Sequence, residues 1–372
     1  MGWLEALKRH LGVGDRLEYA LAVVRLPWTE EMIRNLAPHW VSAPFCALAK
    51  RAENRELLLG LFQGDPENLR RALELAEIAF FRFFPIVGLL TRAGGARQIG
   101  RLPFVESVYT PPEDYGFDYL HILKGLHYVL EHNQQNPESA IHVVNMSLQT
   151  PTPCPFDPLE PINVATRVLS EHDVTVVVAA GNHGASGEDT LSMWAAAPWV
   201  ISVGAAYPDG KRLWERSSRG SPGSPYRPTV VAHGVGVVGL RSPEGVYPAV
   251  DAEGRYTVAD GTSFAAPQVA GLAAVIIQFV RDVLAPSPQV EQWRAIMQSQ
   301  FKLRVLPVTA SPLVVKRMLE HFAVPMPGYG LHEQGAGFVS GEIVAERLRN
   351  FGFSDFIQVF GLPASNAATQ DA

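Results

Sequence analysis

The residue best placed for nucleophilic chemistry is Ser263, which lies in the phrase Gly-Thr-Ser-Phe-Ala-Ala-Pro-Gln-Val-Ala-Gly at 261–271. The apolar residues that follow predict a long buried helix over 263–282, so Ser263 stands at a helix start. Its backbone N–H can face a developing oxyanion there, and the helix dipole favours negative charge. The alternative is a serine that only caps the helix.

A second candidate group is the side-chain amide of Asn182, in the phrase Val-Ala-Ala-Gly-Asn-His-Gly at 178–184. The run 174–180 is continuous and apolar, which is typical of a buried strand, so the amide stands at a strand end. An amide N–H aimed at an oxyanion stabilises a transition state. The same residues could instead make an Asx-type turn without a chemical role.

Together these phrases resemble the subtilisin-like serine proteases, or subtilases. The family's nucleophile motif is Gly-Thr-Ser-x-Ala-x-Pro-x-Val-Ala-Gly, and residues 261–271 match every fixed position. The phrase at 178–184 resembles the family's Ala-Ala-Gly-Asn-x-Gly turn, which implies that Asn182 belongs to the oxyanion hole and Ser263 is the nucleophile. The resemblance runs from about Tyr119 to Leu348. Shorter matching phrases follow in family order at 200–205, 217–220, 227–234 and 335–339.

A third phrase, Val-Val-Asn-Met-Ser-Leu at 143–148, is similar to a family strand whose edge lies beside the bound substrate. The resemblance implies substrate-binding positions at Ser147, Leu148, Gln149, Ala180 and Gly181. The family has two glycines where this chain has Gln149 and Thr150. We expect the side chains at these two positions to crowd a bound peptide.

Two phrases of the subtilase site have no match: the one that carries the catalytic Asp and the one that carries the catalytic His. Residues 111–140 are too few for the strands and helix that hold them, so we expect this half of the site to be deleted. A serine hydroxyl is a weak nucleophile without a base within hydrogen-bond distance. His183, beside Asn182, is a candidate substitute base, although this position in such turns commonly points away from the nucleophile. Four other histidines are candidate bases, but each is expected to be a surface or internally bonded residue: His121, His127, His132 and His142. Asp65 is a candidate for the missing Asp, but Pro66 after it indicates a helix cap instead.

The C-terminal two-thirds of the chain alternates helix and strand. Helices are expected over 119–132 and 164–171, and apolar strands over 141–148, 174–180, 200–205 and 229–232. Continuous apolar strands between helices predict an α/β fold, a mainly parallel sheet of subtilisin type flanked by helices. We expect the sheet to be shortened and its exposed edge to be covered by the N-terminal domain or by a partner chain.

Residues 55–110 predict a small α+β domain with strands over 56–62, 83–91 and 104–109. Its order of elements resembles the propeptide-inhibitor domain of subtilases, which implies a ferredoxin-like fold. Asp65 is expected to cap the helix that follows it. The remaining divisions are an N-terminal extension of uncertain fold at 1–54, with a strand at 17–26 and a helix capped by Thr29, a subtilase-like domain at 111–350, and a C-terminal tail at 351–372.

Composition excludes several classes of protein. The net charge is −6 and no Lys/Arg run occurs, which argues against a nucleic-acid partner. Cys46 and Cys154 fit no metal-ligand spacing and no acidic loop has calcium-ligand spacing, so no cofactor is expected. The N-terminus does not read as a signal peptide, and the apolar run 269–280 is too short to cross a bilayer. We therefore expect a cytoplasmic protein without a membrane partner.

Three functions stay open on the sequence. The first is a degenerate protease that keeps Ser263 and Asn182 and binds a peptide or protein partner. The second is an active serine endopeptidase whose base is rearranged or is supplied by a second chain. The third is a scaffold subunit of a larger assembly.

Overall fold

The computed structural model describes residues 17–25, 29–41, 59–60, 64–111, 116–150, 155–242, 247–301 and 308–361. Two compact units make up the chain. The first consists of residues 1–140 and 157–168, and the second of residues 141–156 and 169–372.

The first unit contains a four-stranded antiparallel sheet in the order β2-β3-β1-β4. Its strands are β1 (Leu17–Val24), β2 (Ala79–Phe80), β3 (Ile86–Arg92) and β4 (Val105–Tyr109), and its helices include α2 (Glu30–Leu36), α5 (Pro66–Ala76) and α6 (Gly95–Ile99). This chain order and strand order are those of a ferredoxin-like fold. The predicted ferredoxin-like α+β fold is therefore confirmed, although its strands run over residues 17–109 and not 55–110, while the propeptide role stays a prediction.

The structure moves the predicted boundary of this domain towards the N-terminus. Strand β1 lies between β3 and β4 and is buried along its length, so residues 17–24 belong to the sheet and not to a separate extension. The sequence identified this strand but gave no sign of its pairing partners. The strand predicted over 56–62 is wrong at 59–60, which are helical, and the rest of it lies outside the described residues.

Both predicted helix caps of this unit are confirmed. The Thr29 hydroxyl accepts a hydrogen bond from the Met32 N–H at 3.2 Å at the start of α2. The Asp65 carboxylate accepts one from the Glu67 N–H at 2.9 Å at the start of α5, with Pro66 as the first helical residue. Asp65 is thus engaged as a cap, which satisfies backbone N–H groups that the helix itself leaves unpaired.

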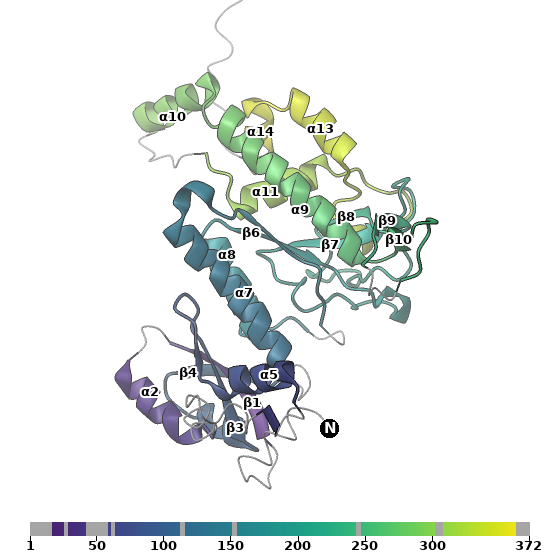
Figure 1. Cartoon of the computed structure of the whole chain (residues 1–372). Coiled ribbons are helices and arrows are strands. Elements are labelled where there is room, and N and C mark those ends of the chain that lie inside the picture. Colours follow the sequence, from purple (N-terminus) through teal and green to yellow (C-terminus); the bar gives the residue numbers. More distant parts are fainter. Residues whose placement is uncertain are drawn as a thin grey trace, which may run out of the picture. The chain divides into compact units, whose positions relative to one another are not determined.

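The second unit is built on a parallel sheet in the order β5-β6-β7-β8, as predicted. The strands are β5 (Val143–Met146), β6 (Thr175–Ala179), β7 (Ile201–Ala206) and β8 (Val230–His233). Helix α9 (Thr262–Phe279) lies across them (Figure 1). Further helices of this unit are α10 (Pro288–Phe301), α11 (Pro312–Phe322), α13 (Gly341–Asn350) and α14 (Phe353–Phe360). Helix α8 (Pro161–Glu171) precedes β6 in the chain, and most of it belongs to the first unit.

The main core of this unit lies between one face of the sheet and helices α9, α10, α11, α13 and α14. Val269, Ala273 and Ile276 of α9 are fully buried in it. The segment Thr262–Leu284 is long and apolar enough to span a membrane by length and composition alone, while one face of it packs in this core and 39% of its apolar window is buried. Phe351, Phe353 and Phe356 belong to the same core, so the predicted tail at 351–372 begins too early. Residues 362–372 lie outside the described chain.

Strand β5 differs from its neighbours. Every residue of β6 and β7 is buried, whereas Val143 and Val144 of β5 are half-buried and Asn145 is exposed. Among the described residues β5 is an outer strand of the sheet, and 116–140 contribute the helix α7 (Gly116–Gln135) and one short 3₁₀ turn but no strand. The predicted loss of the strands that carry Asp and His agrees with this order but stays a prediction.

We expect Asp65→Ala to weaken the start of α5, because the helix loses its cap. The free energy of local opening should fall by about 1 kcal/mol, which raises amide exchange in the first turn about fivefold. Hydrogen exchange with mass spectrometry measures this, and Asp65→Asn, which keeps a capping oxygen, is the control. An unchanged exchange rate in Asp65→Ala would show that the cap contributes nothing.

Candidate active site

Three segments that the sequence singled out meet at one end of the parallel sheet. They are the residues after β5 (147–150), the turn after β6 (180–184) and the start of α9 (261–263), and hydrogen bonds join each pair of them. Parallel strands end at the same edge of a sheet, which brings the first two segments side by side. The fold therefore brings the three phrases together at one place.

The side-chain amide of Asn182 is held in one orientation by Thr262. Its Oδ1 accepts hydrogen bonds from the Thr262 N–H and from the Thr262 hydroxyl, both at 3.0 Å. Its Nδ2 lies 3.6 Å from the point where a Cβ would stand on Gly261, and it donates to no acceptor in the described part of the chain. The amide N–H group is thus free and fixed beside the residues that lead into Ser263, as an oxyanion donor requires.

Ser263 is the second residue of α9 and forms a reciprocal contact with Ser147. The Ser147 hydroxyl donates to the Ser263 carbonyl at 2.8 Å, and the Ser263 hydroxyl donates to the Ser147 carbonyl at 3.4 Å. Residue 267 would normally donate its N–H to the Ser263 carbonyl, but Pro267 has no N–H. Ser147 therefore replaces a hydrogen bond that the helix cannot make, and this ties α9 to β5.

The side chain of Gln149 connects the end of β5 with the turn after β6. Its Oε1 accepts from the Asn182 N–H at 2.8 Å, and its Nε2 lies 3.1 Å from Nε2 of His183. Thr150 is 2% exposed and its N–H donates to the Ser192 hydroxyl at 3.1 Å. The expectation that both side chains crowd a bound peptide is therefore wrong for Thr150, which points into the protein.

The other predicted substrate positions fall into two groups. Leu148 is 43% exposed and available to a ligand. Ala180 is fully buried, and its N–H and C=O pair with Val203 and Ser192. Gly181 is also buried, has a φ of 112°, and a Cβ there would lie 2.8 Å from the Ser218 hydroxyl, so the turn requires glycine. Ala180 and Gly181 are buried beneath the site and offer no side-chain surface to a ligand.

The comparison with known families supplies the identification. A family model described as the subtilase family matches residues 112–319, which is more than half of the chain. The chain belongs to the subtilase family. It has the family's subtilisin-like α/β fold, with a parallel sheet flanked by helices, which is the fold of a serine peptidase.

The known proteins and solved structures to which this subtilase is similar differ from it in most of their sequence. Serine protease AprX of Bacillus subtilis (strain 168) is 30% identical over 169 residues, 42% of this chain and 38% of the relative. Subtilisin-like protease PopC of Myxococcus xanthus (strain DK1622) is 29% identical over 227 residues, 58% of this chain and 40% of the relative. The chain thus spans about two-fifths of the length of these relatives. Among solved structures, the S218A mutant of the protease domain of PatA covers 61% of this chain and 66% of its own, with a TM-score of 0.40 and 23% identity.

No base for Ser263 is present among the described residues of the second unit. The Ser263 hydroxyl is hydrogen-bonded to the Ser147 carbonyl and to no histidine or carboxylate there. The imidazole Nε2 of His183, the candidate substitute, lies 3.1 Å from the Gln149 amide nitrogen, and the backbone N–H of His183 donates to the Ser218 hydroxyl at 2.9 Å. The structure brings His183 into the site but does not pair it with the nucleophile.

The candidate histidines of the first unit have partners within that unit. His121 lies 2.9 Å from Glu74, and His132 lies 3.1 Å from the Ser139 carbonyl. His127 packs among three phenylalanine rings, and burial lowers its pKa. These observations agree with the structural roles predicted for the three histidines.

Sequence reasoning missed two supporting residues of the site, Thr262 and Ser218. Thr262 orients Asn182 and also accepts the Gly181 N–H at 3.2 Å, while Ser218 bonds both Gly181 and His183. Both lie inside phrases that match the family. Their roles depend on contacts across 35 or more positions of the chain, and local sequence carries no signal of those contacts.

We expect Thr262→Val to destabilise the second unit by about 1–3 kcal/mol, because the buried Gly181 N–H loses its acceptor. The isosteric valine keeps the volume, and Thr262→Ser, which keeps the hydroxyl, should stay close to wild type. Thermal unfolding measures the difference. Equal destabilisation by valine and serine would contradict the role of the hydroxyl.

A double-mutant cycle tests whether the Ser147 hydroxyl replaces the hydrogen bond that Pro267 cannot donate to the Ser263 carbonyl. Ser147→Ala should cost about 1 kcal/mol, because the Ser263 carbonyl loses its donor. In a Pro267→Ala background the cost should shrink, since the new N–H at 267 can donate to that carbonyl. Urea unfolding gives the four free energies. Additive effects of the two substitutions would overturn this reading of the contact.

Proposed function

We propose that this subtilase is a degenerate protease whose remaining cleft binds a peptide or protein partner without cleaving it efficiently. The observation that carries the proposal is the state of Ser263, whose hydroxyl has a carbonyl as its partner and no base. Deprotonating a serine hydroxyl needs such a base, so the nucleophile stays weak. The unmatched Asp and His phrases of the sequence support the same conclusion.

The features that would bind a peptide are retained. Leu148 offers exposed apolar surface at the end of β5, and β5 itself is an outer strand with half-buried residues. An extended peptide that pairs with an open strand gains main-chain hydrogen bonds, and neighbouring side chains add selectivity. The free amide N–H of Asn182 can donate to a peptide carbonyl placed beside Ser263. These groups recognise a main chain, so an extended or unfolded segment is the proposed ligand.

One observation favours a second candidate, an active peptidase that gains its base from another chain. The outer strand β5 ends at Ser147, which contacts Ser263 directly. A partner strand added to the edge of β5 that pairs with no other described strand would end close to the serine hydroxyl and could carry an imidazole or a carboxylate there. The fixed orientation of Asn182 agrees with this candidate, because an oxyanion donor serves only a reacting site.

The purified chain should not react with a fluorophosphonate probe, because Ser263 lacks a base. Labelling of the chain and of Ser263→Ala is compared by mass spectrometry, together with hydrolysis of unfolded casein. Labelling of the wild-type chain that disappears in Ser263→Ala would contradict the proposal of a degenerate protease. Labelling found only in the chain isolated from its own cells with bound partners would support the base from another chain.

Unfolded casein should bind the chain through the cleft, and Leu148→Asp should weaken this binding about tenfold, since a charge replaces exposed apolar surface. Fluorescence anisotropy of labelled casein gives the affinities. Val283→Asp is the matched control, because Val283 is 57% exposed and follows α9 on its C-terminal side, some 20 residues or about 30 Å along the helix from Ser263. Equal loss in both variants would contradict a binding site at the cleft.

A further inference from the structure

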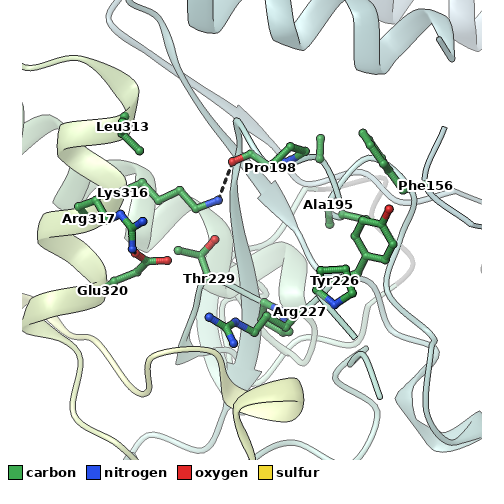
Figure 2. Close-up of a pocket in the computed structure, with 14 residues that line it drawn as sticks. Phe156, Ala195, Pro198, Tyr226, Arg227, Thr229, Leu313, Lys316, Arg317 and Glu320 are labelled. Carbon is green, nitrogen blue, oxygen red and sulfur yellow. Dashed lines mark hydrogen bonds and ion pairs between the residues drawn. The ribbon is translucent and has the colours of Figure 1, made fainter. Parts of the chain in front are cut away.

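A cavity of about 500 Å³ lies in the second unit, between α11, the segment before β7 and the segment before β8. None of its lining residues belongs to the Ser263 site. Figure 2 shows Lys316 extending from α11 towards Pro198, with Arg227 on the same side and the rings of Tyr226 and Phe156 on the opposite side. Cavities of roughly 300–1,000 Å³ hold small organic ligands.

The ammonium group of Lys316 is partly buried in this cavity and forms no ion pair among the described residues, although the Glu320 carboxylate is near enough to favour its charge. Its Nζ donates to the carbonyls of Pro198 and Val200, both at 2.9 Å. An ammonium group has three N–H donors, so one remains for a ligand. Burial lowers the pKa of Lys316, which shows that the surroundings disfavour its charge. A bound anion would supply the missing compensation.

The other charges of the cavity lead to the same conclusion. Arg227 is exposed and forms no ion pair in the described chain. Arg317 is paired with Glu320 at 3.3 Å, which neutralises both of them. The described lining thus has three cations, Lys316, Arg227 and Arg317, against one carboxylate, Glu320, so positive charge is in excess. A guanidinium and an ammonium on one side of a cavity are suited to a carboxylate.

The opposite side of the cavity is apolar and aromatic. The rings of Phe156 and Tyr226 lie 5.7 Å apart at 49°, and Ala195, Pro198 and Leu313 add aliphatic surface. Aromatic rings pack well against a further ring or a large apolar side chain. A small inorganic anion would leave this surface unused.

We propose that this cavity binds a carboxylate that carries an aromatic or large apolar group. The carboxylate accepts from Lys316 and Arg227, and the apolar group packs against Phe156 and Tyr226. This chemistry occurs both in a free aromatic acid and at the C-terminus of a peptide with an aromatic last residue.

Isothermal titration of the full chain with N-acetyl-phenylalanine and its uncharged amide tests the site. The acid should bind at least tenfold more tightly than the amide. Arg227→Gln should weaken binding of the acid about fivefold or more, and this exposed residue can change without loss of the fold. Arg281→Gln is the control, because Arg281 is exposed and paired with Asp282 at 2.7 Å, and it should bind like wild type. Equal binding of acid and amide, or no binding of the acid, would overturn the proposal.

Two further probes separate the sources of the carboxylate. Tighter binding of N-acetyl-alanyl-phenylalanine than of 3-phenylpropionate supports a peptide C-terminus, and the reverse order supports a free aromatic acid. If neither binds, the cavity takes no apolar carboxylate. None of these measurements depends on Ser263, so their outcome is independent of the proposed function.

Discussion

The site of this subtilase depends on the contact between Asn182 and Thr262. Two hydrogen bonds of 3.0 Å to a single oxygen fix the amide, and they connect the turn after β6 to the start of α9 across 80 positions of the chain. The same threonine hydroxyl accepts the Gly181 N–H, so one side chain sets both the turn and the amide. Without this contact the Nδ2 group of Asn182 would not be held beside Ser263. The rest of the site is arranged around this fixed point.

The start of α9 shows how one residue type forces a contact elsewhere. Pro267 removes the N–H that would normally bond the Ser263 carbonyl, and an unpaired carbonyl in a packed structure is costly. Ser147 supplies the donor from the end of β5. The start of α9 is therefore tied to the end of strand β5 through Ser147 and Ser263.

The sequence predicted the elements of this protein better than their assembly. Apolar runs identified all four parallel strands, and cap residues such as Thr29 and Asp65 marked helix starts, because these signals are local. The membership of 17–24 in the first sheet and of Phe353 and Phe356 in the second core was not predicted, because strand pairing and packing join distant residues. At the site, the sequence motifs indicated Ser263 and Asn182 but not the inward orientation of Thr150, since a residue at a strand end can face either way.

The arrangement separates two requirements that an efficient serine peptidase must meet together. Stabilising an oxyanion needs fixed donors, and the amide of Asn182, which Thr262 holds in place, and the helix start at Ser263 are groups of this kind. Creating the nucleophile needs a base, which the described second unit does not hold within reach. In subtilisin, the oxyanion hole and binding alone keep an acceleration of about 10³–10⁴ over water when triad members are removed. On the function proposed above, a site with these donors and no base holds a carbonyl without cleaving it efficiently.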